Sequence, residues 1–132
     1  MVEILRKTIT NMSFDETVEH VQTIVASEGF TVLLTKAIDQ VIEKKLGVKD
    51  YPRYTSIMAC GADLAKAALD VHKDVGTLFP CSFVVYEEDS EIKVAHVSIM
   101  KIAAELGFTS HEAMAPVIKK TGERVSAAWD KI

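Results

Sequence analysis

The fold of this chain is decided by residues 78–86, Leu78-Phe79-Pro80-Cys81-Ser82-Phe83-Val84-Val85-Tyr86. The run from Phe83 to Tyr86 consists of β-branched and aromatic residues, which favour a pleated strand that is buried on at least one face. Proline is tolerated only at the first residue of such a strand or on a sheet edge. Pro80 therefore predicts that a central strand begins at Cys81 and runs to about Glu87.

A second strand is expected over residues 92–97, directly after the acidic turn Glu88-Asp89-Ser90. A loop this short joins strands only as an antiparallel hairpin, since a parallel connection needs a long crossover. The two strands therefore predict the core of an antiparallel sheet.

The first half of the chain alternates between strand and helix patterns. Strands are expected over residues 2–10, 31–35 and 54–60, and helices over residues 14–28, 38–46 and 62–72. Ser13 and Glu16 form a capping box at the start of the first helix. Gly29 and Gly47 supply the left-handed residues that end the first and second helices. The opening unit is therefore strand, helix, strand.

The C-terminal part reads as helical. Ser98 is expected to cap a helix over residues 99–106, and Thr109 with Glu112 forms a second capping box. Pro116 interrupts the last helical region, so this region either kinks there or gives way to a new helix with Pro116 at its first position. Together the patterns predict one α+β domain over residues 1–132, with a β-α-β start, a largely antiparallel sheet and helices packed on one face.

Composition limits the function classes. The 132 residues are 48% hydrophobic with a formal net charge of -4, which argues against the basic face that nucleic-acid binding needs. No apolar run is long enough to cross a bilayer, and no signal-peptide pattern opens the chain, so we expect a cytoplasmic protein with no membrane partner. The two cysteines lie far apart in the sequence, which predicts reduced thiols.

Several of these marks together resemble one small prokaryotic family, the domain of unknown function numbered three-zero-two. They are the helix end at Gly29-Phe30, the strand from Tyr54 to Cys60, the Ala-rich helix after it, and the start of the next strand at Pro80-Cys81. The resemblance covers roughly residues 14–97 and implies a TATA-binding-protein-like α+β fold, homodimers and no established activity. Two strand ends depart from the family pattern, at Gly61-Ala62 and at 98–100, so any ligand of this chain can differ from that of its relatives.

Cys60 and Cys81 are the first candidate site residues, because both lie at strand ends. The structural interpretation is that they are small core hydrophobes, since free cysteine is among the most buried residue types. The functional interpretation rests on Gly61, which would let a backbone or ligand come close, and on the helix N-terminus after it, which favours a thiolate.

Met58, Tyr54 and His96 complete the ligand-binding candidates, giving the set Cys60, Cys81, Met58, His96, Tyr54 and Gly61. The sulfur and imidazole groups among them would suit Cu(I), but their proximity depends on strand register, so no metal site is predicted. The cofactor is unknown. Further polar or aromatic residues near element ends are Tyr51, Arg53, His72, Lys73 and His111.

No catalytic motif is present: the sequence has no phosphate loop, no Gly-x-Ser-x-Gly elbow and no HExxH helix. The leading hypothesis is a homodimeric protein that binds a small ligand or handles sulfur through its strand-end cysteines. The alternative is a structural or regulatory interaction module with core cysteines. A thiol enzyme with His96 or His72 as base has the least support.

A second copy is expected to cover the apolar surface that the sheet leaves open, through Trp129, Val125 and residues 83–86. The alternative is that residues 109–132 fold back over their own sheet and leave a monomer.

Overall fold

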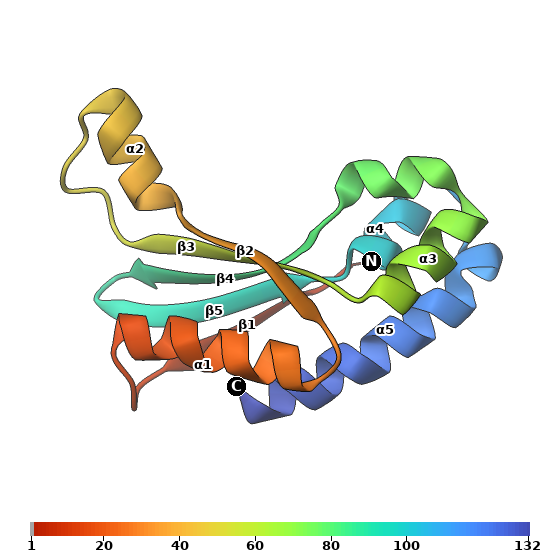
Figure 1. Cartoon of the computed structure of the whole chain (residues 1–132), viewed down its shortest axis with the longest axis horizontal. Coiled ribbons are helices and arrows are strands. Elements are labelled where there is room, and N and C mark those ends of the chain that lie inside the picture. Colours follow the sequence, from red (N-terminus) through yellow and green to blue (C-terminus); the bar gives the residue numbers. More distant parts are fainter. Residues whose placement is uncertain (1) are drawn as a thin grey trace.

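A five-stranded sheet organises the computed structural model, which describes residues 2–132 (Figure 1). Its strands run antiparallel in the order β1-β5-β4-β3-β2, so the two edge strands come from the start of the chain. The strands are β1 (Ile4–Ile9), β2 (Thr31–Ala37), β3 (Tyr54–Cys60), β4 (Cys81–Glu88) and β5 (Glu91–Val97). The expected α+β class, β-α-β start and antiparallel sheet are confirmed.

β4 is the central strand and begins at Cys81, directly after Pro80, as the sequence predicts. Its hairpin with β5 is also confirmed. Asp89 and Ser90 form the turn with φ values of 53° and 63°, the left-handed pair of a type I′ turn. This turn matches the twist of the two strands it connects.

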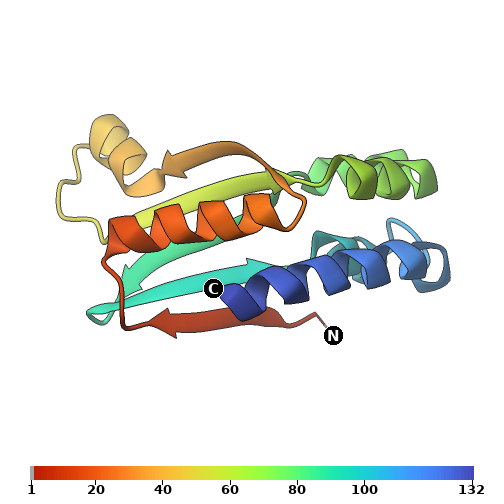
Figure 2. The ribbon, with the colours of Figure 1, turned by 60° about the horizontal axis from the view of Figure 1, so that its bottom comes forward.

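Two helices, α1 (Phe14–Ser27) and α5 (His111–Lys131), lie side by side across one face of the sheet (Figure 2). They bury the row of side chains that successive strands contribute to that face, such as Ile57, Phe83 and Val94. We call this the covered face. Removal of this apolar surface from water is the main source of stability.

The remaining helices lie beyond the two ends of the strands rather than on a face (Figure 1). They are α2 (Ile38–Leu46), α3 (Ala62–Val71), the short 3-10 helix η1 (Lys73–Leu78) and α4 (Ile99–Glu105). At one end, α3, η1, α4 and the start of α5 enclose a second apolar cluster around Met100 and Met114. At the other end, α2 projects from the body and has no buried residue.

Most helix ends follow the sequence signals. Ser13 and Glu16 make the expected capping box, and the Ser98 hydroxyl accepts from the Lys101 N–H at the start of α4. The second capping box is wrong by one residue, because α5 is capped by Ser110, whose hydroxyl accepts from the Ala113 N–H.

The alternative that a new helix begins at Pro116 is wrong, since α5 is continuous through this residue. Packing of α5 against α3 and α4 compensates for the backbone hydrogen bond that proline cannot make.

The opposite face of the sheet, which we call the open face, carries no helix (Figures 1 and 2). Side chains alternate between the two faces, so neighbouring residues of one strand have opposite environments. Phe83 and Val85 are fully buried on the covered face, whereas Val84 and Tyr86 are half-buried on the open face. Within residues 2–132 no helix is both long and apolar enough to span a membrane.

The surface expected to bind a second copy is wrong. Val125 and Phe83 belong to the chain's own core, and Trp129 packs against that core beside β1, where the Lys7 ammonium donates to the Trp129 carbonyl. The C-terminal helix therefore folds back over its own sheet, so Val125, Phe83 and Val85 are not available to a partner. Trp129 is half-buried against the core, and Val84 and Tyr86 lie half-buried on the open face.

Candidate functional site

The open face contains a groove with a volume of about 860 Å³. Its floor is formed by four adjacent strands, and the loop before β3 and the β4–β5 turn border it. The floor side chains are Ile4, Arg6, Tyr54, Ser82, Val84, Tyr86, Ala95 and Val97. The register explains why they meet, because Ile4 pairs with Val97, Arg6 with Ala95, and Tyr54 with Tyr86.

Two tyrosines form the aromatic part of this floor. The rings of Tyr54 and Tyr86 stack across β3 and β4 with centroids 5.7 Å apart and planes 23° apart. Burial raises the pKa of the Tyr54 phenol, and the neighbouring Tyr86 and Tyr51 add to this effect. The Tyr54 phenol therefore stays neutral at physiological pH, where it can donate or accept a hydrogen bond.

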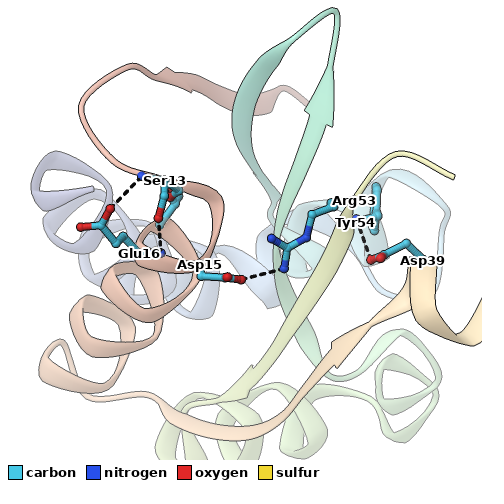
Figure 3. Close-up of polar contacts among 7 residues, drawn as sticks. Ser13, Asp15, Glu16, Asp39, Arg53 and Tyr54 are labelled. Carbon is cyan, nitrogen blue, oxygen red and sulfur yellow. Dashed lines mark hydrogen bonds and ion pairs between the residues drawn. The ribbon is translucent and has the colours of Figure 1, made fainter. Parts of the chain in front are cut away.

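The loop before β3, which forms one wall of the groove, is tied to two helices by polar contacts (Figure 3). The Arg53 guanidinium donates to the Asp15 carboxylate at 2.6 Å and lies over the Phe14 ring at 4.1 Å, which ties the loop to α1. The Tyr54 N–H donates to the Asp39 carboxylate at 3.0 Å, which ties the loop to α2. This wall is therefore preformed, and Arg53 is already occupied.

Arg6 is the unoccupied cation of the groove. Its side chain is exposed on β1, and no hydrogen bond or ion pair within residues 2–132 engages its guanidinium. The opposite end of the groove is acidic, with Glu87, Glu88 and Asp89, of which Glu88 accepts from Lys93 at 3.2 Å. The groove thus has an apolar, aromatic centre with a cation at one end and acids at the other.

Cys60 and Cys81 lie at one cavity, which is separate from the groove on the open face. They line a small apolar cavity at the β3–α3 junction, with Gly61, Leu64, Met100 and Thr121 among its walls. Its volume of about 20 Å³ is close to the minimum for a single water molecule. Burial raises the pKa of the Cys81 thiol to about 11, and the nearby Cys60 contributes to this effect. Cys81 is therefore a thiol rather than a thiolate at neutral pH.

Gly61 is needed for a contact between helices. The Arg124 side chain passes over it to form a two-pronged ion pair with Asp63 at 2.9 and 2.8 Å. A Cβ at position 61 would lie 2.9 Å from the Arg124 Nη1 atom and 3.1 Å from the Leu64 Cδ1 atom. This ion pair, joined by Lys120, holds the pKa of the Asp63 carboxyl well below its usual range. Gly61 thus lets α5 approach the start of α3.

His96 borders the groove, but its ring lies on the covered face. The ring stacks on Phe83 with centroids 4.1 Å apart, and its Nδ1 atom is 2.8 Å from the Ser82 carbonyl. Burial lowers the pKa of His96, so the imidazole is neutral near pH 7. Its Nε2 atom has no hydrogen-bond partner within the part of the chain that the structure describes.

The six candidate residues therefore separate into groups. Cys60, Cys81 and Gly61 share the small cavity, Tyr54 is in the groove, and Met58 lies on the open face opposite Ser82. Tyr51 and Arg53 also border the groove, whereas His72 and His111 have acidic neighbours elsewhere. Across residues 2–132, no three His, Cys, Asp or Glu residues gather closely enough to hold a metal ion.

Sequence reasoning missed Arg6, Ser82 and Val84 as groove residues. The signal was available in part, because alternation along β1 and β4 places each of them on a definite face. What was missing was the strand order, which brings β1 beside β5 from the far end of the chain.

Comparison with known proteins places the chain in a family. The sequence matches the family described as "Domain of unknown function DUF302" over residues 5–132. A crystal structure of an uncharacterized conserved DUF302 protein from Bacillus stearothermophilus has the same fold, with a TM-score of 0.83 at 20% sequence identity. The alignment covers 97% of this chain and 96% of that one. No curated protein matches the sequence. The chain belongs to the DUF302 family.

Proposed function

We propose that this protein binds a small, flat and largely apolar carboxylate in the groove on the open face. The observation that carries this proposal is the groove itself, about 860 Å³ in volume, with a stacked tyrosine pair on its floor and an unpaired arginine at one end. This volume lies within the range of about 300–1,000 Å³ that is usual for small-molecule sites.

The chemistry of the ligand follows from that of the groove. A planar ring system can extend the stack of Tyr54 and Tyr86, and aliphatic side chains such as Val84 and Val97 would contact its edges. The Arg6 guanidinium would pair with the carboxylate through two parallel hydrogen bonds. The acids at the opposite end of the groove would repel a second anionic group, so the ligand carries its charge at one end.

Calorimetric titration with 1-naphthoate tests the proposal. We expect saturable binding to the wild-type protein and roughly two- to tenfold weaker binding to Tyr86→Ala, because a stacking contact contributes about 0.5–1.5 kcal/mol. Tyr86→Phe keeps the ring and should bind nearly as well as wild type. Arg6→Gln should weaken binding, whereas Lys45→Gln, on the projecting helix α2, should not. Absence of binding, or equal binding to Tyr86→Ala, would refute the proposal.

A thiol-handling function has less support. The raised pKa of Cys81 and the small volume around it argue for the interpretation of both cysteines as packing residues. We expect an aromatic disulfide reagent to modify both thiols more slowly in the native protein than in a denatured control. A faster native reaction at either cysteine would restore the thiol-handling hypothesis.

We also propose that two copies of the chain form a dimer through the region around α2, in place of the surface that the sequence suggested. Among residues 2–132, five of the seven large exposed apolar residues lie here, in β2, α2 and the loop after it: Leu33, Leu34, Leu46, Val48 and Tyr51. Leu46 is 73% exposed. A twofold contact is the commonest way to bury such a surface.

Sedimentation velocity at micromolar concentration tests the dimer. We expect twice the chain mass for wild type and the 14.5 kDa single-chain mass for Leu46→Asp. Leu106→Asp changes an equally apolar, exposed residue outside this region and serves as the control. A wild-type mass of one chain would contradict the proposal.

A further inference from the structure

A second cavity, of about 240 Å³, lies on the other side of the sheet, between α5 and the β1–β5 edge. Its lining combines apolar surface, from residues such as Leu5 and Val125, with the polar side chains of Glu3, His96, Ser98, Lys101, Thr121 and Ser126. At about 30 Å³ for each water molecule in the liquid, this space corresponds to roughly eight waters. The cavity is therefore large enough for a compound of a few heavy atoms.

Two buried atoms of this lining lack a hydrogen-bond partner in residues 2–132: His96 Nε2 and Thr121 Oγ1. The two residues are only 5% and 3% exposed, and both line the same cavity. Buried polar atoms are rarely left unpaired, because each loses its hydrogen bond to water without replacement. Two such atoms at one cavity need a partner from outside the chain, which either water or a bound ligand supplies.

The tautomer of His96 fixes what that partner must be. The Ser82 carbonyl can only accept a hydrogen bond, so the Nδ1 atom that contacts it carries the proton. Because the ring is neutral, Nε2 is left with a free lone pair and can only accept. The ligand must therefore donate to Nε2.

Thr121 adds a second requirement. Its hydroxyl makes no hydrogen bond to the backbone of α5, so it is free both to donate and to accept. A single ligand hydroxyl can donate to His96 Nε2 while it accepts from the Thr121 hydroxyl. An amine or ammonium group, which lacks this acceptor at neutral pH, satisfies only part of the pair.

The charged side chains at this cavity indicate which charge the ligand carries. Lys101 is exposed at the start of α4, and its ammonium has no ion-pair partner in the described part of the chain. Glu3 lines the same cavity and opposes a second negative charge. A ligand with a single carboxylate can pair with Lys101, and Glu3 disfavours any further negative charge on it.

We propose that this cavity is a binding site for a small hydroxycarboxylate monoanion, separate from the groove on the open face. The ligand hydroxyl bridges His96 Nε2 and the Thr121 hydroxyl, and its carboxylate pairs with Lys101. Both buried atoms are closed to solvent in the unliganded arrangement, so neighbouring side chains shift slightly when the ligand enters.

L-lactate and propionate are a matched pair of probes, because they differ only in the hydroxyl group. Nitrogen NMR of the His96 ring at constant, near-neutral pH reports directly on Nε2. We expect L-lactate to shift this resonance saturably, with a Kd on the order of 1 mM, and propionate to bind about tenfold more weakly.

Two variants separate the contacts. Thr121→Val keeps the size of the side chain and removes its hydroxyl, so the variant should remain folded. Its affinity for L-lactate should fall about tenfold, and its affinity for propionate should not change. Lys101→Gln should lower the affinity for both probes, whereas Lys45→Gln should change the affinity for neither. Tyr86→Ala, which disrupts the open-face groove, should leave L-lactate binding intact.

Three outcomes would overturn the proposal: no saturable shift of His96 with L-lactate, equal affinity for the two probes, or unchanged L-lactate affinity in Thr121→Val. None of these depends on whether the open-face groove binds 1-naphthoate.

Discussion

The two faces of the sheet use the same strands for different purposes. On the covered face, Leu5, His96, Phe83 and Ile57 form a continuous row across four strands beneath the helices. One residue further along each strand, the open face has side chains such as Arg6, Ala95 and Val84, which line the groove. Adjacent residues therefore lie in different environments, one in the core and the next in the groove, and substitutions can test the two faces independently.

The largest effect is expected from Phe83→Ala. Phe83 is fully buried, and its ring contacts both Phe30 and His96. Truncation of a buried aromatic side chain costs about 3–5 kcal/mol. Chemical denaturation should show a loss of this size in the free energy of unfolding. A loss below about 1 kcal/mol would mean that the covered face does not dominate stability.

A matched pair of valines compares the faces directly. Val85→Ala on the covered face should cost about 2 kcal/mol, from two buried carbon groups at about 0.8 kcal/mol each and the cavity they leave. Val84→Ala on the half-buried open face should cost less than about 1 kcal/mol. Denaturant midpoints of the two variants measure the difference, and equal losses would contradict the division between the faces.

Gly61→Ala tests the junction where β3 meets the helices. The new methyl group would press on Arg124 and Leu64, at a cost of about 1 kcal/mol. This estimate is at the low end for overpacking because the nearest atom is the end of a flexible side chain. Gly122→Ala is the control, since a methyl group there meets nothing within 4 Å. Thermal unfolding should show a lower midpoint only for Gly61→Ala.

The smallest effect should be a pH dependence that arises from His96. Burial lowers the pKa of the folded ring below its ordinary value of 6.5, so the unfolded chain binds the proton more readily. This part of the stability is present above pH 6.5 and declines as the pH falls through that value. Carboxylates as a class titrate mainly at lower pH.

His96→Phe keeps a ring beside Phe83 but removes the titration. Its unfolding free energy should therefore depend less on pH near neutrality than that of wild type. Identical pH profiles for wild type and His96→Phe would show that the ring is protonated equally in both states.

Local signals in the sequence account for most of the fold. The ranges expected for α2 and β3 agree with the structure, because a glycine ends α2 and a proline precedes β3. The hairpin followed from the length of its turn. The errors lie where tertiary packing overrides a local signal, as at Pro116, where contacts of α5 with its neighbours keep the helix continuous.

The candidate site was less accessible to sequence reasoning. Tyr54, Tyr51 and Arg53 could be selected because they lie near the end of an element. Arg6 and Tyr86 could not be joined to them, because their proximity depends on pairings between distant strands. The orientation of His96 toward the covered face depends in the same way on register, which one strand alone does not specify.

The placement of β1 at one edge and β2 at the other has a consequence for synthesis of the chain. During translation, β3, β4 and β5 emerge in turn, and each can pair at once with the strand made just before it. β1 is made first but must wait for β5, since Ile4 pairs with Val97. For most of translation β1 is thus an unpaired strand, the kind of segment that aggregates. Arg6 and Lys7 within β1 place two positive charges on it, and like charges on neighbouring nascent chains repel one another during that interval.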